Sequence, residues 1–170
     1  TIDNMIYLAT DHAGFELKEK VKKYLQELGH KVEDCGAFEF DKDDDYPDFI
    51  SKAAEAVSKD PESRAIVFGS SGQGEAMVAN KFPNIRAAVF YTPSVPAHNV
   101  DVTGRESSDP FEMIRLTREH NDANILSLGA KILQDEDALK AVKLWLEAPF
   151  TKEPRHLRRI EKIRKIEENL

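Results

Sequence analysis

The segment Phe68-Gly69-Ser70-Ser71-Gly72-Gln73-Gly74-Glu75-Ala76-Met77 joins an apolar run to a run of helix-forming residues. Residues 64–68 before it are apolar and β-branched and predict a short buried strand. The residues after Gly74 predict a helix over 75–81. A strand, a glycine-rich turn and a helix in this order direct free backbone N–H groups towards one point. The segment therefore predicts either a site for an anion or a developing oxyanion, or an ordinary strand-to-helix turn.

The glycine-rich turn does not match the standard phosphate-binding or nucleophile motifs. A P-loop requires a lysine after its last glycine, but Glu75 follows Gly74. The dinucleotide fingerprint requires a third glycine where Met77 stands, and a nucleophile elbow around Ser71 requires a glycine in place of Gln73. Glu75 remains unusual, because it is either a favourable partner of the helix dipole or a base beside an oxyanion hole.

Length and composition indicate one soluble domain over residues 1–170, of which 41% are hydrophobic. The net charge of −7 argues against a general nucleic-acid binder. No apolar run approaches the roughly 18 residues of a membrane span, and no signal peptide is apparent at Thr1. A single cysteine, Cys35, excludes an internal disulfide. These observations predict a cytoplasmic protein with no membrane or nucleic-acid partner.

The whole chain alternates strand-like and helix-like segments. Strands are expected at 5–10, 31–35, 64–68, 85–90 and 123–128, and helices at about 14–28, 46–58, 75–81, 111–121, 135–147 and 155–170. This alternation predicts an α/β fold, a doubly wound parallel sheet with helices on both faces. Ligands of such sheets bind outside the carboxyl ends of the strands. We expect Asp11, His12, the glycine-rich turn, His120 and Asn121 to converge there, although each could be structural alone.

Several motifs together resemble the ribose-5-phosphate isomerase B family, which includes the galactose-6-phosphate and allose-6-phosphate isomerases. The resemblance covers the chain except for residues 92 to about 116. Its landmarks are Asp11-His12-Ala13-Gly14-Phe15-Glu16-Leu17-Lys18, Asp34-Cys35-Gly36, Asp45-Tyr46-Pro47, Ala79-Asn80-Lys81, His120-Asn121-Asp122-Ala123-Asn124 and Arg155-His156-Leu157-Arg158-Arg159-Ile160.

The resemblance implies a base and a reaction. One branch of the family has a cysteine at the position of Gly69, and the other has a glutamate at the position of Glu75, so this chain is similar to the glutamate branch. The implied reaction is aldose–ketose interconversion through an enediolate, with no cofactor and no metal. Glu75 would move the proton between C2 and C1, in a balance between burial, which raises its pKa, and the helix dipole, which lowers it.

The resemblance also implies the other site residues. Ser71 would bind the O1/O2 edge of the sugar, Asp11 and His120 would help to open its ring, and Asn121 would bind the substrate. Backbone amides around Ser70 to Gly74 would hold the developing oxyanion. The substrate-binding residues of the turn would be Gly69, Ser70, Gly72, Gln73 and Gly74. The phosphate would meet His12, Lys131, Arg155 and Arg159. Relatives have arginine where this chain has Lys131, which keeps the charge but loses the bidentate fork.

The C-terminal tail predicts the oligomeric state, and residues 92–116 predict an insertion. The tail 155–168 has a narrow apolar stripe, which predicts a homodimer or tetramer, and the alternative is a solvated basic face. The resemblance implies that subunits share each active site, with Arg155 and Arg159 reaching in from the partner. Residues 92–116 are expected to be an insertion that either borders the sugar pocket or decorates the surface.

Ribose 5-phosphate and ribulose 5-phosphate are the expected substrates. The alternatives are another four- to six-carbon phosphosugar, such as an erythrulose, allose or galactose phosphate, and a non-catalytic phosphosugar-binding module.

Overall fold

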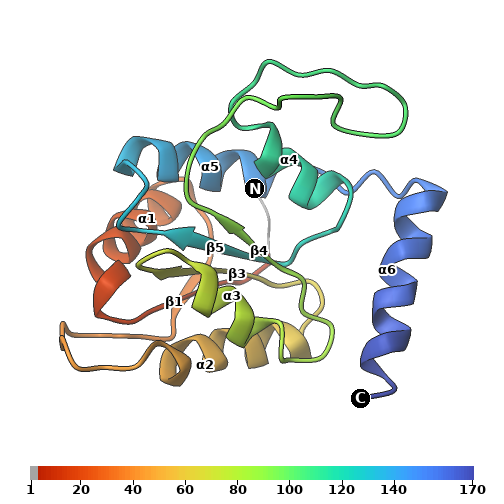
Figure 1. Ribbon diagram of the computed structural model, residues 1–170. Helices are drawn as coiled ribbons and strands as arrows, with labels where there is room; N and C mark the ends of the chain where they lie inside the picture. The colour runs from red at the N-terminus through yellow and green to blue at the C-terminus, as the bar shows by residue number, and fades with distance from the viewer. Residues whose placement is uncertain (1–3) are drawn as a thin grey trace.

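The computed structural model describes residues 4–170 and has one five-stranded sheet between two layers of helices (Figure 1). The strand order is β2-β1-β3-β5-β4, and every neighbouring pair is parallel. The strands are β1 (Ile6–Thr10), β2 (Val32–Asp34), β3 (Arg64–Gly69), β4 (Ala87–Phe90) and β5 (Ile125–Gly129). This confirms the α/β fold class that the alternating pattern predicts.

Helices cover both faces of the sheet, as a doubly wound fold requires. Helices α1 (Phe15–Glu27), α4 (Glu112–Glu119) and α5 (Asp135–Glu147) cover one face, and α2 (Tyr46–Lys59) and α3 (Gln73–Ala79) cover the other (Figure 1). A short 3₁₀ turn, His12–Gly14, precedes α1. Helix α3 begins two residues earlier than expected, because Gly72 takes a left-handed conformation (φ +79°) that ends the loop there.

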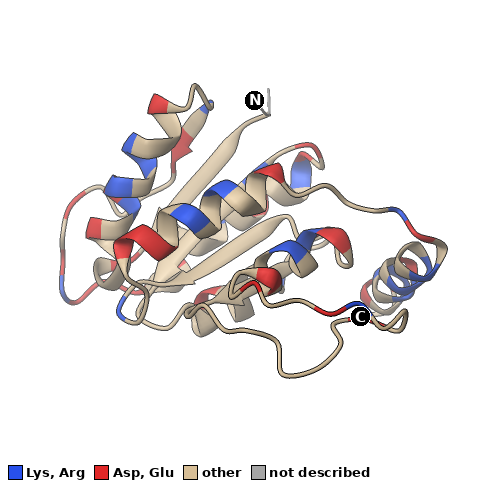
Figure 2. Ribbon diagram, turned by 90° about the horizontal axis from the view of Figure 1, so that it is seen from above, with Lys and Arg blue, Asp and Glu red and all other residues tan. Residues whose placement is uncertain are grey.

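The sheet separates two apolar cores. The larger one lies under α1, α4 and α5 and includes the fully buried Trp145, whereas the smaller one lies under α2 and includes Ile50 and Val57. Side chains of β3 and β5 are buried on both faces, which explains their continuous apolar sequences. Charged residues lie mainly on the helices and loops, and the central strands are almost free of them (Figure 2).

Helix α6 (Pro154–Glu167) projects away from the sheet and its covering helices (Figure 1). His156 is its one buried residue, while Leu157, Ile163 and Ile166 are 48%, 51% and 65% exposed. The apolar stripe that the sequence predicts therefore faces outwards in the single chain. Within residues 4–170, no helix has both the length and the apolar character needed to cross a bilayer.

Candidate functional site

The carboxyl ends of β1 and β3 lie side by side and bring Asp11 next to the glycine-rich loop. Thr10 pairs with Phe68 in the sheet register, and the Thr10 hydroxyl donates to the Phe68 carbonyl at 3.0 Å. Strand β2 lies on one side of β1 and β3 on the other, so this is the point at which the strand order reverses. The Asp11 carboxylate accepts from the Ala13 amide at 2.9 Å and caps the 3₁₀ turn.

Glu75, in the first turn of α3, folds its carboxylate back over Gly69. Its side chain is buried, with 5% exposed, and a Cβ at Gly69 would lie 1.8 Å from Glu75 Oε1. A side chain at position 69 and a glutamate carboxylate from position 75 would therefore occupy the same space. Burial raises the pKa of Glu75, and the nearby Asp11 charge raises it further, while a hydrogen bond to the Glu75 backbone lowers it. Desolvation thus outweighs the helix N-terminus in the balance expected from the sequence.

The glycine-rich loop is held in place by the end of β5. The Gly69 and Ser70 carbonyls accept from the Ala130 and Lys131 amides at 2.8 and 3.1 Å. The Ser127 hydroxyl donates to the Gly72 carbonyl at 2.5 Å. These bonds fix the loop against the end of β5. Helix α3 begins at Gln73, and the N–H groups of its first turn have no intrahelical acceptor.

The predicted site residues of this edge differ in exposure. Ser71 and Gly74 are half-buried, and Ser70, Gln73 and Lys131 are exposed at the same edge.

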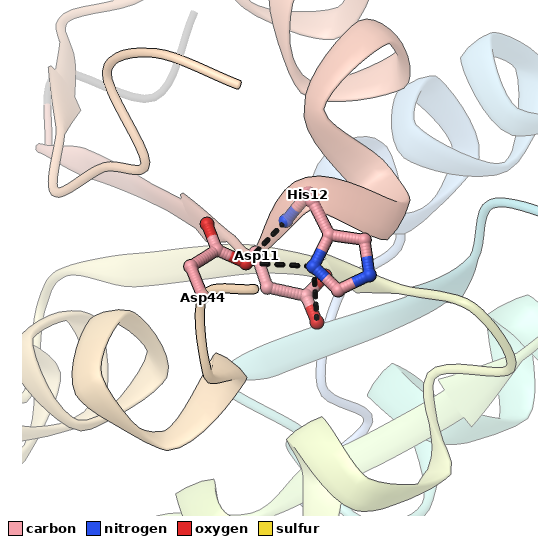
Figure 3. A group of neighbouring side chains, drawn as sticks. All are labelled: Asp11, His12 and Asp44. Atoms are coloured by element: carbon pink, nitrogen blue, oxygen red, sulfur yellow. Dashed lines mark hydrogen bonds and ion pairs between the residues drawn. The ribbon is translucent and has the colours of Figure 1, made fainter. Parts of the chain in front are cut away.

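His12 is bonded to Asp44, a residue of the acidic loop before α2 (Figure 3). Asp44 Oδ1 accepts from the His12 backbone amide at 2.9 Å and lies 2.7 Å from His12 Nδ1. The Asp44 hydrogen bond raises the pKa of His12, and burial opposes that rise. Sequence analysis missed Asp44, because the only indication was an acidic run, which usually faces solvent.

Asp11, His12 and Asp44 also place one ligand atom each within 4.8 Å of one another, a grouping that could hold a metal ion. In this arrangement His12 Nδ1 is engaged with Asp44, and Asp11 Oδ2 lies 3.9 Å from the same nitrogen. A metal would have to replace these contacts. The Asp44 hydrogen bond and the Asp11 charge both favour the protonated form of His12.

His120 lies at a second position with Arg155 and Arg159 of α6, in a hollow of about 290 Å³ that Asp11 and Glu75 do not line. The rings of His120 and His156 stack with centroids 4.2 Å apart. Burial lowers the pKa of His120, and the charges of His156 and Arg105 lower it further. The hollow is lined by Asn99, Val100, Asp101, Val102, His120, Arg155, His156 and Arg159.

The structure thus corrects the expectation that one chain brings all the polar groups to one edge. Helix α4 ends at Glu119, and the next segment enters the start of β5. His120 and Asn121 therefore lie where β5 begins, whereas Asp11 and Glu75 lie where β1 and β3 end. The Asn121 side chain is exposed, and its backbone carbonyl accepts from Arg86 Nε at 2.9 Å.

Comparison with known proteins gives consistent matches over nearly the whole chain. A model of the Ribose/Galactose Isomerase family matches residues 6–101 and 108–163. Ribose-5-phosphate isomerase B of Mycolicibacterium paratuberculosis is 40% identical over 156 residues, which are 92% of this chain and 87% of that relative. The Escherichia coli protein of the same name is 33% identical over 96% of each chain.

Solved structures match equally well. The crystal structure of ribose-5-phosphate isomerase B from Mycoplasma genitalium with bound ribulose-5-phosphate has a TM-score of 0.86 and 30% identity, and the match covers 100% of both chains. The Clostridium thermocellum ribose-5-phosphate isomerase B has a TM-score of 0.82 and 38% identity over 97% of this chain and 98% of its own. The family match includes residues 92–101 and 108–116, so 102–107 are the part of the expected insertion that it leaves out.

Proposed function

The chain belongs to the ribose/galactose isomerase family, and we propose that it interconverts ribose 5-phosphate and ribulose 5-phosphate through an enediolate. The matched relatives carry this activity in their names, and one of them was solved with ribulose-5-phosphate. The reaction moves hydrogen between C1 and C2 of one molecule, so the oxidation of one carbon balances the reduction of its neighbour. For that reason the proposal includes no redox cofactor.

One observation carries the proposal: the buried Glu75 carboxylate lies against Gly69, beside the glycine-rich loop. A base must stay ionised near neutral pH and still accept a proton, and the raised pKa of Glu75 makes its carboxylate the stronger proton acceptor. Glu75 takes the proton from C2 and returns it to C1. The loop amides from Gly69 to Gly74 stabilise the developing oxyanion, and Ser71 binds the O1/O2 edge.

We propose further that each active site needs two chains. His12 and Lys131 supply positive charge at the Glu75 edge, whereas Arg155 and Arg159 lie in the hollow beside His120. All four cations can contact one phosphate only if the hollow beside His120 in one chain faces the edge of the sheet that carries Glu75 in a partner chain. The exposed stripe on α6 supports this arrangement, because packing it against a second copy would bury Leu157, Ile163 and Ile166. On this account His120 and Asn121 enter the site with the partner's arginines.

The test is a direct assay of the purified protein. Ribose 5-phosphate should be converted to ribulose 5-phosphate, and kcat/KM should be lower for four- and six-carbon phosphosugars. A higher value for another phosphosugar would assign the alternative substrate, and binding without turnover would indicate a non-catalytic module. Dialysis against EDTA should leave activity unchanged, and activity restored only by a divalent ion would contradict the metal-free mechanism.

We also propose a cytoplasmic location for this activity. Cys35 is half-buried, and burial raises the pKa of its thiol to about 11. The thiol packs against the smaller core, and a single cysteine without an internal disulfide suits a reducing compartment.

A further inference from the structure

Three arginines surround a separate hollow of about 190 Å³ near the beginnings of the strands. Arg64 is the first residue of β3, Arg86 immediately precedes β4, and Arg118 lies in the last turn of α4. This hollow shares no lining residue with the one beside His120. It also lies at the opposite end of β3 from the Gly69 backbone and Glu75.

The arginines have fewer negative partners than their charges require. Asp122 pairs with Arg118 at 2.8 Å and with Arg86 at 3.2 Å, so one carboxylate serves two guanidinium groups. Glu62 is the other acidic residue of the lining, and it is exposed. Among the described residues, the cluster therefore keeps an excess of positive charge in its interior.

Arg118 is the most confined of the three, with only 5% of the residue exposed. Its Nη1 donates to the Ala123 carbonyl at 2.6 Å, but its Nε is buried and has no hydrogen-bond partner within residues 4–170. A buried donor of a charged group that lacks an acceptor is costly. An anion in the hollow would supply negative charge beside this confined guanidinium.

Arg64 is held loosely above Trp145. Its guanidinium lies 5.4 Å from the centre of the indole ring, and its Nη1 reaches the Trp145 and Leu146 carbonyls only at 3.4 and 3.3 Å. Burial lowers the pKa of Arg64 to about 10, and the charge of Arg118 contributes to that shift. These contacts cap the end of α5, and the Asp122 charge, which raises the pKa of Arg64, opposes the effect of Arg118 less strongly than Arg118 exerts it.

We propose that this hollow binds a phosphate group, either inorganic phosphate or a small phosphomonoester. Guanidinium groups match the geometry of phosphate oxygens with paired N–H donors, and three of them from separate elements surround the volume. The site is distinct from the phosphate contacts proposed for the isomerase reaction. Occupancy would join β3, β4 and α4 through one ligand and so stabilise the folded chain.

Trp145 provides a built-in probe, because it is the chain's only tryptophan and contacts the cluster. Phosphate is titrated into the full-length protein at constant ionic strength, with chloride as the balancing ion, while tryptophan fluorescence is recorded. The wild type should show a saturable change with phosphate and with glycerol phosphate. Saturation by only one of them identifies which form of the phosphate group the hollow accepts.

Three variants separate this site from other effects. Arg64→Met and Arg86→Met should each weaken phosphate binding by about tenfold or more, because each removes a guanidinium charge from the lining of the hollow. Arg64→Met alters the surroundings of the Trp145 fluorophore directly. Arg86→Met is therefore needed as a second test that leaves that contact in place. Arg115→Met, which removes a half-buried arginine of α4 outside this hollow, should leave the titration unchanged.

Equilibrium dialysis in the Arg155→Ala/Arg159→Ala protein should still show about one phosphate bound per chain, independent of isomerase activity. Failure of the isomerase assay would therefore not affect this result. The proposal is contradicted if phosphate gives no saturable change, if chloride alone gives the same change, or if Arg64→Met and Arg86→Met bind phosphate as the wild type does. In each of these cases the cluster is a structural element held by Asp122 and carbonyl groups.

Discussion

The two ends of the sheet carry polar clusters that differ in burial: one is buried and fixed within the chain, and the other is partly exposed on a projecting helix. At the carboxyl ends of β1 and β3, Glu75 is buried against Gly69, and the loop around it is fixed by hydrogen bonds from the end of β5. In the hollow beside His120, Arg155 is half-buried and Arg159 exposed on a helix that projects from the rest of the chain (Figure 1).

This difference indicates which part of the site one chain completes by itself. The proton-transfer groups are already positioned, so they need no partner to acquire their geometry. His120 and Arg155 are held together through His156, which stacks on His120 and has its Nε2 3.1 Å from Arg155 Nε. We expect substitutions at the first position to affect turnover within each subunit, and substitutions at the second to act across the interface.

The largest effect is expected from Glu75→Gln, which keeps the shape and removes the base. Turnover should fall by roughly 10²–10⁴-fold. That loss corresponds to about 3–5 kcal/mol of barrier. Steady-state kinetics with ribose 5-phosphate measure it, and KM should change little. Cys35→Ser serves as a control outside the proposed machinery, and near-normal turnover by Glu75→Gln would remove Glu75 from the mechanism.

A smaller loss is expected from Gly69→Ala, which leaves Glu75 in place but fills the space of its carboxylate. The new Cβ would lie 1.8 Å from Oε1, so the flexible end of Glu75 must move. Displacement of this size should cost roughly 10–100-fold in kcat. In a Glu75→Ala background the same substitution should add almost nothing, because the group that it displaces is absent. Equal losses in both backgrounds would show that Gly69→Ala acts by distorting the loop, and thermal unfolding of each variant provides the control.

The smallest effect is expected from Asp44→Asn, because Asp44 acts only through His12. It holds the imidazole in place and favours its protonated form. The Asp44 hydrogen bond raises the pKa of His12, so its loss should lower that pKa and reduce the protonated fraction of His12 as the pH rises. KM for ribose 5-phosphate should then rise about threefold to tenfold at pH 8, and less at pH 6, where His12 is protonated more often in both proteins. kcat should be nearly constant. A KM increase that is the same at both pH values would indicate a structural role only, and Asp43→Asn, at an exposed residue of the same loop, is the matched control.

Much of the fold follows from local sequence, and part of the site does not. The apolar run before Gly69 and the helix formers after Gly74 predict β3 and α3, since both depend on neighbouring residues. The contact between Asp44 and His12 joins residues 32 apart through an irregular loop, for which the sequence offers no periodicity. His120 was expected beside Asp11 because it lies near a crossover of the sheet, but the direction of α4 relative to the sheet determines where His120 lies. A pattern along one chain also cannot show which groups meet across an interface.

Complementation between inactive variants tests the division of the site. Three proteins are prepared, Glu75→Gln, His120→Ala and Arg155→Ala/Arg159→Ala, and pairs are co-expressed so that subunits mix. The residues changed in the last two variants line the hollow beside His120, whereas Glu75 lies at the carboxyl ends of β1 and β3. Each protein alone should have little activity.

The decisive measurement is the activity of the Glu75→Gln and Arg155→Ala/Arg159→Ala mixture. If two chains share each site, half of the dimers in a random one-to-one mixture are mixed, and one of their two sites is intact. Activity should therefore recover to roughly a quarter of the wild-type value. Glu75→Gln with His120→Ala should recover similarly, whereas His120→Ala with the arginine variant should not recover. If co-expression restores no activity in any pair while mixed dimers are present, Glu75 and the arginines act within one chain and the shared site is wrong.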